Sequence, residues 1–253
     1  MEQLFTQLSA LDPAELTFWQ DFFMKFYRAF LYEDRWMQYL DGVGTTLLAT
    51  ALALLLGVAL GILVAVIRTA HDQQRPGQRN FLLGVVNVIM KIYVTIIRGT
   101  PMVLQLMIWM FVVFTWSRNA TAVGVFGLGI NSGAYVSEIV RGGLMAVDGG
   151  QMEAGRSLGL NYFDTMRFIV IPQAFKAILP ALGNEFIVLL KDTSLLSVIA
   201  GKELLYAARG VANRTYEQMF PLVGAAIIYL VLVMIFTWLL GKLERRLRQS
   251  DRR

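Results

Sequence analysis

The chain has 253 residues, of which 56% are hydrophobic and 16% are charged, so a water-soluble fold is not expected and the bilayer is the predicted solvent. The sequence contains no cysteine, which excludes disulfides, thiolate metal sites and cysteine catalysis. A formal net charge of +5 would suit nucleic acid, but the basic residues gather in loops and in the tail 242–253, as membrane topology requires. A nucleic-acid partner is therefore not expected.

Residues 1–42 are predicted to form an N-terminal segment at the membrane surface. Phe18, Phe22, Phe26 and Phe30 recur at every fourth position, which would give a helix one aromatic face with polar residues off that face. This pattern favours a helix that lies in the interface on the extracytoplasmic side. The alternative is a helix that packs on a neighbouring loop.

Two long uncharged runs are predicted to cross the membrane, at residues 43–67 and 219–241. Each exceeds the roughly 20 residues that a helix needs to cross about 30 Å of hydrocarbon. No internal repeat is visible in the sequence. Residues 43–241 are therefore predicted to form one membrane domain.

The apolar stretch 81–117 would be about 55 Å long as one helix, which is too long for a simple crossing. Arg98-Gly99-Thr100-Pro101 interrupts it, because a proline biases the preceding residue away from the helical region. Either two crossings meet there, or an interfacial helix leads into one.

Charge predicts the direction of the chain. The tail 242–253 is rich in Lys and Arg, and the loop that follows the first crossing holds Arg68, Arg75 and Arg79, so both are predicted to be cytosolic. An outside N-terminus and an inside C-terminus require an odd number of crossings. We expect an all-α integral membrane protein with five, in which a cytosolic-side helix containing Lys91 leads into the second. The crossings are expected at about residues 43–67, 99–117, 120–147, 178–200 and 219–241.

Residues 148–176 are predicted to form a cytosolic loop between the third and fourth crossings. Residues 151–158 follow a turn and can form a short helix that ends at Gly159 in the left-handed conformation. Asn161 is a helix N-cap, followed by Asp164 three residues later, and a second helix runs towards Pro172. The loop is thus a compact helix-turn-helix that presents Glu153 to a partner.

This loop resembles the permease subunits of binding-protein-dependent ABC importers. Their loop reads Glu-Ala-Ala, three residues, Gly, nine residues, then Ile-x-Leu-Pro. The departures in this chain are Gly155 for alanine and Ile171 for leucine. Further blocks, which begin at Arg98, Asn131 and Pro180, are similar to the polar amino acid branch, and to glutamine-type or general amino-acid-type permeases within it. The matching loop positions are Glu153, Ala154, Gly155, Gly159, Ile169, Ile171 and Pro172.

The resemblance implies that the loop is the coupling helix, which would sit in a cleft of a separate ATPase subunit. It implies a pair of such ATPases, an extracytoplasmic amino-acid-binding protein and a second permease, either a copy or a paralogue. It implies a multi-pass location in the bacterial cytoplasmic (inner) membrane. The coupling residues would be Glu153, Ala154, Gly155, Arg156, Gly159 and Pro172.

No phosphate-binding loop of the form Gly-x-x-x-x-Gly-Lys-Ser/Thr occurs in the sequence, so ATP and Mg²⁺ would bind to the partner subunit. No metal-ligand cluster or nucleophile-base arrangement stands out either. The chain is therefore expected to be a transport subunit that holds no cofactor and is not itself an enzyme.

Charged residues inside a crossing are functional candidates, because they cost several kcal/mol unless they face protein, water or each other. Glu138 and Arg141 are spaced to pair on one helix face, with a structural or a pathway role. A zwitterionic amino acid needs partners for its carboxylate and its ammonium group, and the polar cluster of the fourth crossing supplies both charges. The alternative for this cluster is a gate or a set of contacts between helices. The pathway candidates are Asn184, Lys191, Asp192, Thr193 and Ser194, with Thr100 and Gln105 from the second crossing.

A second function class is an autonomous ion-coupled amino acid transporter, which would use Lys191 and Asp192 as a proton or cation site. Such carriers usually show inverted internal repeats, and none is visible here. They also have no need of the loop motif. The importer subunit is therefore the preferred interpretation.

Overall fold

The structure is a computed structural model that describes residues 1–12, 15–74 and 80–250, and the side chains up to residue 247. Arg75, Arg79 and residues 251–253, to which the topology prediction assigned cytosolic charge, lie outside the described residues. Within the described part every regular element is helical. The helices are α1 (Glu2–Ser9), α2 (Phe18–Phe30), α3 (Trp36–Asp72), α4 (Phe81–Gly99), α5 (Met102–Ile108), α6 (Ala120–Met145), α7 (Gly150–Ser157), α8 (Tyr162–Thr165), α9 (Ile171–Asp192), α10 (Leu204–Thr215) and α11 (Met219–Ser250).

Five helical stretches of the described residues are long and apolar enough to cross a membrane, which agrees with the predicted number. Short 3₁₀ segments, Tyr32–Asp34 and Thr193–Ile199, extend the first and fourth of them. The stretches are Tyr32–Asp72, Phe81–Gly99, Ala120–Met145, Tyr162–Ile199 and Met219–Leu247.

The predicted position of the second crossing, at residues 99–117, is wrong. The crossing is α4, and the apolar helix that follows it, Met102–Val113, is too short to span the hydrocarbon. Thr100 and Pro101 have extended backbone angles, so α4 ends at the expected place but is itself the crossing. Parity alone could not distinguish the two halves of the stretch, and the helix containing Lys91 is the crossing, with Lys91 exposed in its middle, where it must face water or protein.

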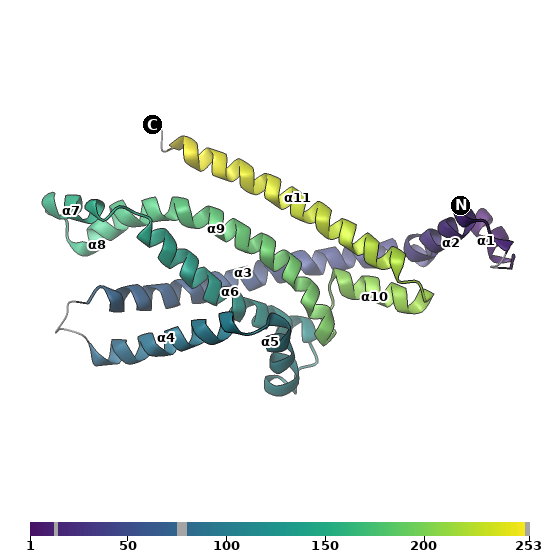
Figure 1. Ribbon diagram of the computed structural model, residues 1–253, viewed down its shortest axis with the longest axis horizontal. Helices are drawn as coiled ribbons and strands as arrows, with labels where there is room; N and C mark the ends of the chain where they lie inside the picture. Colours follow the sequence, from purple (N-terminus) through teal and green to yellow (C-terminus); the bar gives the residue numbers. More distant parts are fainter. Residues whose placement is uncertain (13–14, 75–79, 251–253) are drawn as a thin grey trace.

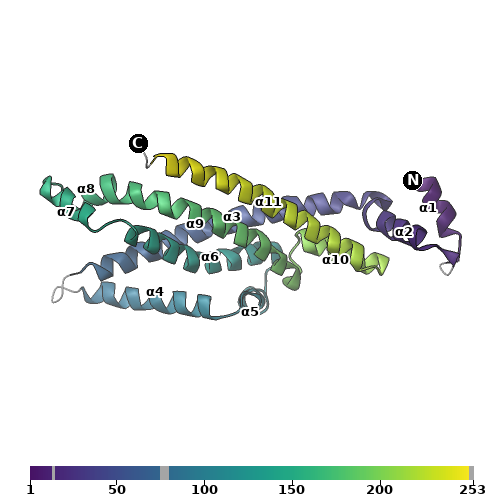
Figure 2. The same ribbon diagram turned by 45° about the horizontal axis from the view of Figure 1, so that its top comes forward.

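The two ends of the molecule differ in what they contain (Figure 1). The loop end carries α7, α8, the end of α3, the start of α4 and the C-terminal end of α11. The opposite end carries α1, α2 and α10. Figure 2 shows α3 and α4 running side by side in opposite directions, so the chain reverses between its first two crossings.

The core is built on close packing of α3 against α6. A Cβ atom added to Gly57 would lie 2.7 Å from the Ser132 hydroxyl, and one added to Gly61 would lie 2.5 Å from Val136. Small residues are common where membrane helices pack, because they let the two backbones approach. Only glycine therefore fits at these two positions of α3.

The segment 200–218 contains a helix that the sequence analysis did not anticipate. The buried Glu203 begins α10, and its carboxylate accepts hydrogen bonds from the amides of Leu205 and Tyr206. The Tyr229 hydroxyl donates to the same carboxylate over 2.6 Å. Thr46 of α3 accepts a hydrogen bond from the Leu204 amide. Glu203 and its neighbours therefore fasten α10 to α3 and α11.

Candidate functional site

The end of α7 is closed by the left-handed glycine that the sequence predicts. Gly159 has φ of +80°, and its amide donates to the Arg156 carbonyl over 2.9 Å. The Leu160 amide donates to the Gly155 carbonyl over 3.0 Å, which completes a Schellman motif. The Gly155 and Arg156 carbonyls at the end of the short helix are thus satisfied by the turn around Gly159.

The second short helix begins at Asn161, as predicted. The Asp164 amide donates to Asn161 Oδ1 over 2.9 Å, and Asn161 Nδ2 donates to the Asp164 carboxylate over 2.7 Å. These bonds satisfy donors at the start of α8 that have no partner inside the helix. α7 and α8 therefore form a hairpin with both of its inner ends capped.

Gly155 is buried where α7 packs on α8, directly against Thr165. Its neighbours Glu153, Ala154 and Arg156 are exposed. Two large apolar side chains, Leu158 and Phe163, are 78% and 81% exposed at the same tip. A tip with this mixture of exposed charge and exposed apolar surface suits contact with a protein partner.

The hairpin is fastened to the long helices. The Tyr162 hydroxyl donates to the Gln73 side chain at the end of α3, and Gln173 of α9 donates to Gln151 over 3.2 Å. α8 passes through a π-helical turn, Met166–Val170, directly into α9, where Pro172 occupies the first turn. The π turn changes the hydrogen-bond register directly before Pro172, which has no N–H to donate. A displacement of α8 is thus carried into α9 along continuous helix.

Glu138 and Arg141 lie together on α6, with Arg141 Nη2 3.2 Å from the Glu138 carboxylate. Arg68 of α3, which the sequence analysis assigned only to loop charge, donates to the other oxygen of the same carboxylate. The cluster therefore joins two crossings near the loop end. Charge alone gave no signal for Arg68, because pairing across helices depends on the fold.

Thr100 and Gln105 lie at the break between α4 and α5. Gln105 Nε2 donates to the Ile97 carbonyl over 2.7 Å and to the Thr100 hydroxyl over 2.8 Å. Asn131 of α6 donates to Gln105 Oε1 over 3.0 Å. The partners of the buried Gln105 amide thus come from α4, from the break itself and from α6, and together they hold the break against α6.

The candidates on α9 differ in exposure. Asn184 and Lys191 are exposed, whereas Asp192 and Ser194 are half-buried. Thr193 is buried, and its hydroxyl donates to the Leu190 carbonyl over 2.7 Å. Among the described residues Lys191 and Asp192 form no ion pair within 4.0 Å, so both charges stay available to a further group.

Glu185, on the same crossing, accepts a hydrogen bond from Ser132 of α6 over 2.7 Å. This bond fixes α9 against the face of α6 that packs on α3. Glu185 therefore has a defined partner within the chain, unlike Lys191.

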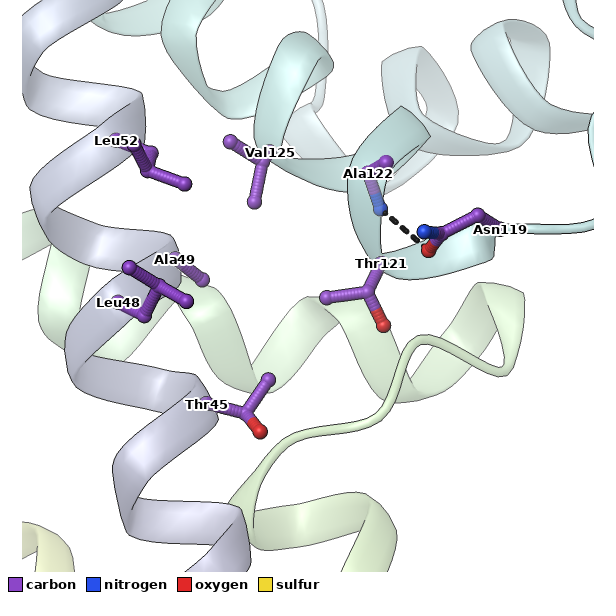
Figure 3. A pocket seen from close by; sticks show the side chains of 8 residues that line it. All are labelled: Thr45, Leu48, Ala49, Leu52, Asn119, Thr121, Ala122 and Val125. Atoms are coloured by element: carbon purple, nitrogen blue, oxygen red, sulfur yellow. Dashed lines mark hydrogen bonds between the residues drawn. The ribbon is translucent and has the colours of Figure 1, made fainter.

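A cavity of about 270 Å³ lies between α3 and the start of α6, near the opposite end (Figure 3). Leu48, Leu52 and Val125 line it, and Asn119 caps α6 at its edge by accepting a hydrogen bond from the Ala122 amide. Its wall is mostly apolar, and none of the pathway candidates lines it. Its chemistry does not suit a polar amino acid.

Residues 77–249 match the model of a family described as binding-protein-dependent transport system inner membrane component. The arginine transport system permease protein ArtQ of Bacillus subtilis is 36% identical over 84% of this chain and 93% of its own length. The glutamine transport system permease protein GlnP of Escherichia coli K12 is 32% identical over 83% of this chain and 92% of its own length.

Solved structures of ABC transporters are similar to this chain as well. A crystal structure of an amino acid ABC transporter with histidines is 38% identical, has a TM-score of 0.74 and covers 83% of this chain and 94% of its own. An inward-facing structure of the MetNI methionine ABC transporter, at 19% identity and a TM-score of 0.71, shares the fold over 86% of this chain and 99% of its own. This chain belongs to the family of binding-protein-dependent transport system inner membrane components.

Proposed function

We propose that this chain is the membrane-spanning subunit of an ATP-driven importer for a polar amino acid, most nearly glutamine-like, and that it couples to a separate ATPase through the α7–α8 hairpin. The single observation that carries this proposal is the hairpin, with its two caps and its exposed charged and apolar tip. The names of relatives such as GlnP and ArtQ support the amino acid class.

The hairpin suits a coupling role because it is rigid in itself and continuous with the crossings. Its exposed residues Glu153, Ala154 and Arg156 would contact the ATPase, Gly159 would hold the backbone turn and Gly155 the packing on α8. Pro172 would lie at the joint with α9. Closure of two ATPase subunits would move such hairpins as units and tilt α9 with them.

The orientation that follows places the loop end in the cytosol and α2 and α10 outside. Arg68 at the end of α3 and Lys242, Arg245 and Arg246 at the end of α11 lie at the loop end and are the charges that support this orientation, while Arg98, Lys202, Arg209 and Arg214 lie towards the opposite end. Cytosolic ends of membrane helices carry an excess of Lys and Arg. The membrane would be the bacterial cytoplasmic (inner) membrane.

A second permease, a copy or a paralogue, would cover the polar faces that the crossings leave open. On α6, Asn131, Tyr135, Glu138 and Arg141 lie on one side of the helix, where Asn131 bonds Gln105 of α5 and Glu138 bonds Arg68 of α3. The Arg98 guanidinium lies 5.2 Å from the Tyr135 ring. Such groups face protein or water rather than lipid, so a pathway between two permeases would run along this face.

The substrate pathway would also use α9. Lys191 and Asp192 would meet the carboxylate and the ammonium group of the amino acid, with Asn184, Thr193 and Ser194 near them. Thr100 and Gln105 would then act by shaping the pathway at the α4–α5 break. An extracytoplasmic binding protein would deliver the substrate, and ATP and Mg²⁺ would act on the partner ATPase.

The test is ATP-driven uptake of labelled glutamine by vesicles that contain this chain and the ATPase that co-purifies with it. Glu153→Ala and Gly159→Asp should abolish most uptake at normal expression, and Glu153→Ala should weaken recovery of the ATPase. Glu15→Ala is the matched control, since Glu15 is also an exposed glutamate but lies at the opposite end. Full uptake by both loop variants, or failure to recover an ATPase under crosslinking, would overturn the proposal.

A further inference from the structure

Helix α2 carries an open aromatic face at the opposite end of the molecule. Phe18 and Trp19 are 72% and 74% exposed, and Phe22 and Phe26 are also exposed. Burial of aromatic surface is strongly favourable, so an exposed group of four such rings marks a site of contact. The question is what covers it.

The helix itself is held firmly. At its C-terminal end Phe30 packs on Tyr39 of α3, with ring centroids 5.3 Å apart, and on Gly224 of α11, where an added Cβ would come within 2.5 Å of the Phe30 ring. Phe22 lies 4.9 Å from Phe220 of α11. The free aromatic rings therefore belong to a helix that is fixed in place.

The polar side of α2 has partners of its own. Lys25 lies 2.7 Å from Asp21 and 3.9 Å from Glu217, which precedes α11 by two positions. The Lys25 ammonium donates a hydrogen bond to the Asp21 carboxylate, which raises the pKa of Lys25 above its ordinary value. α2 thus separates a paired, charged side from an unpaired, aromatic side.

The apolar face of α11 indicates how deep in the membrane α2 lies. Exposed apolar side chains run along α11 from Met219 to Trp238, a rise of about 29 Å at 1.5 Å per residue, which matches the hydrocarbon thickness of about 30 Å. At one end of this face Lys242 lies 3.5 Å from the Trp238 ring centroid, a pairing typical of a membrane boundary. Phe220, which α2 covers, therefore marks the other boundary.

The geometry points to insertion of Phe18, Trp19, Phe22 and Phe26 into the lipid interface, so that α2 is a monotopic anchor in the leaflet at the opposite end. The occupant is a lipid surface, because Phe22 and Phe26 contact Phe220 and the aromatic face thereby continues the apolar face of α11. Tryptophan and phenylalanine are residues that interfacial helices bury at the level of the head groups. The anchor would fix the outer ends of α3 and α11, which α2 contacts.

Depth measurement by spin labels tests this inference on the full chain. The native sequence has no cysteine, so each label reports one site. Labels would be placed by Phe18→Cys and Trp19→Cys, by Val231→Cys as a control on the exposed apolar face of α11, and by Arg28→Cys as a control on the polar side of α2. The protein would be reconstituted in vesicles of phosphatidylethanolamine and phosphatidylglycerol, and relaxation by oxygen and by a water-soluble nickel chelate would be compared.

At positions 18 and 19 oxygen should relax the label more strongly than the nickel chelate does. The ratio of relaxation by oxygen to relaxation by the chelate should lie between the ratios at positions 231 and 28. A ratio equal to that of position 28 would show that the face lies in water and would overturn the inference. Protection from both reagents would show that protein covers the face, a second copy or a binding protein, and would overturn it as well. The labels replace exposed side chains, and elution of each variant as the native peak in detergent checks its folding. The inference does not depend on which substrate the chain transports.

Discussion

Gly155 of α7 lies so close to Thr165 of α8 that a Cβ atom on the glycine would come within 2.5 Å of the threonine methyl group and 2.6 Å of its hydroxyl. Thr165 is fully buried, and its hydroxyl donates to the Asn161 carbonyl. The threonine therefore has little room to move. This pair explains why glycine fits at position 155, where the alanine of the loop pattern it resembles would clash.

Gly155→Ala should lower the free energy of unfolding by about 1–3 kcal/mol, the usual cost of an added methyl group in a packed contact. Thermal unfolding of the purified protein in mild detergent measures this effect. The double variant Gly155→Ala/Thr165→Ala should recover most of the loss, since it removes both atoms that clash. Gly149→Ala is the matched control, because nothing lies within 4 Å of the Cβ it would add. Equal melting temperatures for Gly155→Ala and Gly149→Ala would refute the prediction.

Gly159 should tolerate asparagine better than alanine. Its φ of +80° disfavours residues with a side chain, and asparagine adopts the left-handed conformation more readily than alanine does. Gly159→Ala should cost about 1 kcal/mol and reduce ATP-driven uptake, while Gly159→Asn should lie between alanine and the native protein. Uptake normalised to the amount of recovered ATPase measures the effect. Identical uptake for the alanine variant would mean that the turn is not needed for coupling.

The two ends of this hairpin could be predicted from the sequence, whereas its packing could not. Gly159 and Asn161 cap neighbouring backbone within a few residues, so local rules suffice. The contact between Gly155 and Thr165 depends on how two helices lie, and no local pattern reports it. The sequence therefore shows that position 155 is glycine where the loop pattern has alanine, but it does not show the contact with Thr165 that requires glycine there.

Gln105→Leu should lower stability by about 1–3 kcal/mol, because it leaves the Asn131 amide and the Thr100 groups without their partner. Thermal unfolding of Gln105→Leu, Asn131→Leu and the double variant forms a cycle that measures the coupling. A large coupling energy would assign Gln105 to structure. Unchanged stability together with an altered KM for uptake would instead assign it to substrate contact.

The second crossing shows where reasoning from charge fails. Parity fixes an odd number of crossings, but it does not say which part of the apolar stretch 81–117 is the crossing. In the structure Lys91 lies on an exposed face of α4. The interruption of the helix at Thr100 and Pro101 comes after the crossing rather than before it. The predicted number of crossings is nevertheless correct, because an odd number follows from the sides on which the two ends of the chain lie and not from the position of the second crossing.

Glu138→Gln should destabilise the protein more than Arg68→Gln does. The Glu138 carboxylate pairs with both Arg68 and Arg141, so its loss leaves two arginines without a partner, whereas loss of Arg68 leaves the carboxylate paired with Arg141. Loss of the carboxylate leaves two positive groups on partly buried helix faces, and we expect a cost of about 1–3 kcal/mol. The double variant Glu138→Gln/Arg68→Gln should be less damaged than Glu138→Gln alone. Melting temperatures in detergent give the order, and additive losses would show that the two side chains do not interact.

Lys191 and Asp192 should act on opposite ends of the transported amino acid. Both are open to a further partner, since neither is paired within the described chain, and each would form a charge-assisted hydrogen bond with substrate. Lys191→Gln and Asp192→Asn should each raise KM for uptake about ten- to hundredfold with normal recovery of the ATPase, the range expected for loss of one hydrogen bond to a charged group. Asp41→Asn, an exposed aspartate on α3, is the control.

A substrate analogue separates the roles of the two charges. The native transporter should be inhibited more strongly by glutamine than by an analogue whose α-carboxylate is an amide, and Lys191→Gln should remove that difference while Asp192→Asn keeps it. The physical reason is that Lys191 can sense the substrate's carboxylate only through its own charge. If Lys191→Gln still discriminated against the amide as the native protein does, the carboxylate would bind elsewhere, and the exposed Arg98 beside Tyr135 would be the next residue to vary.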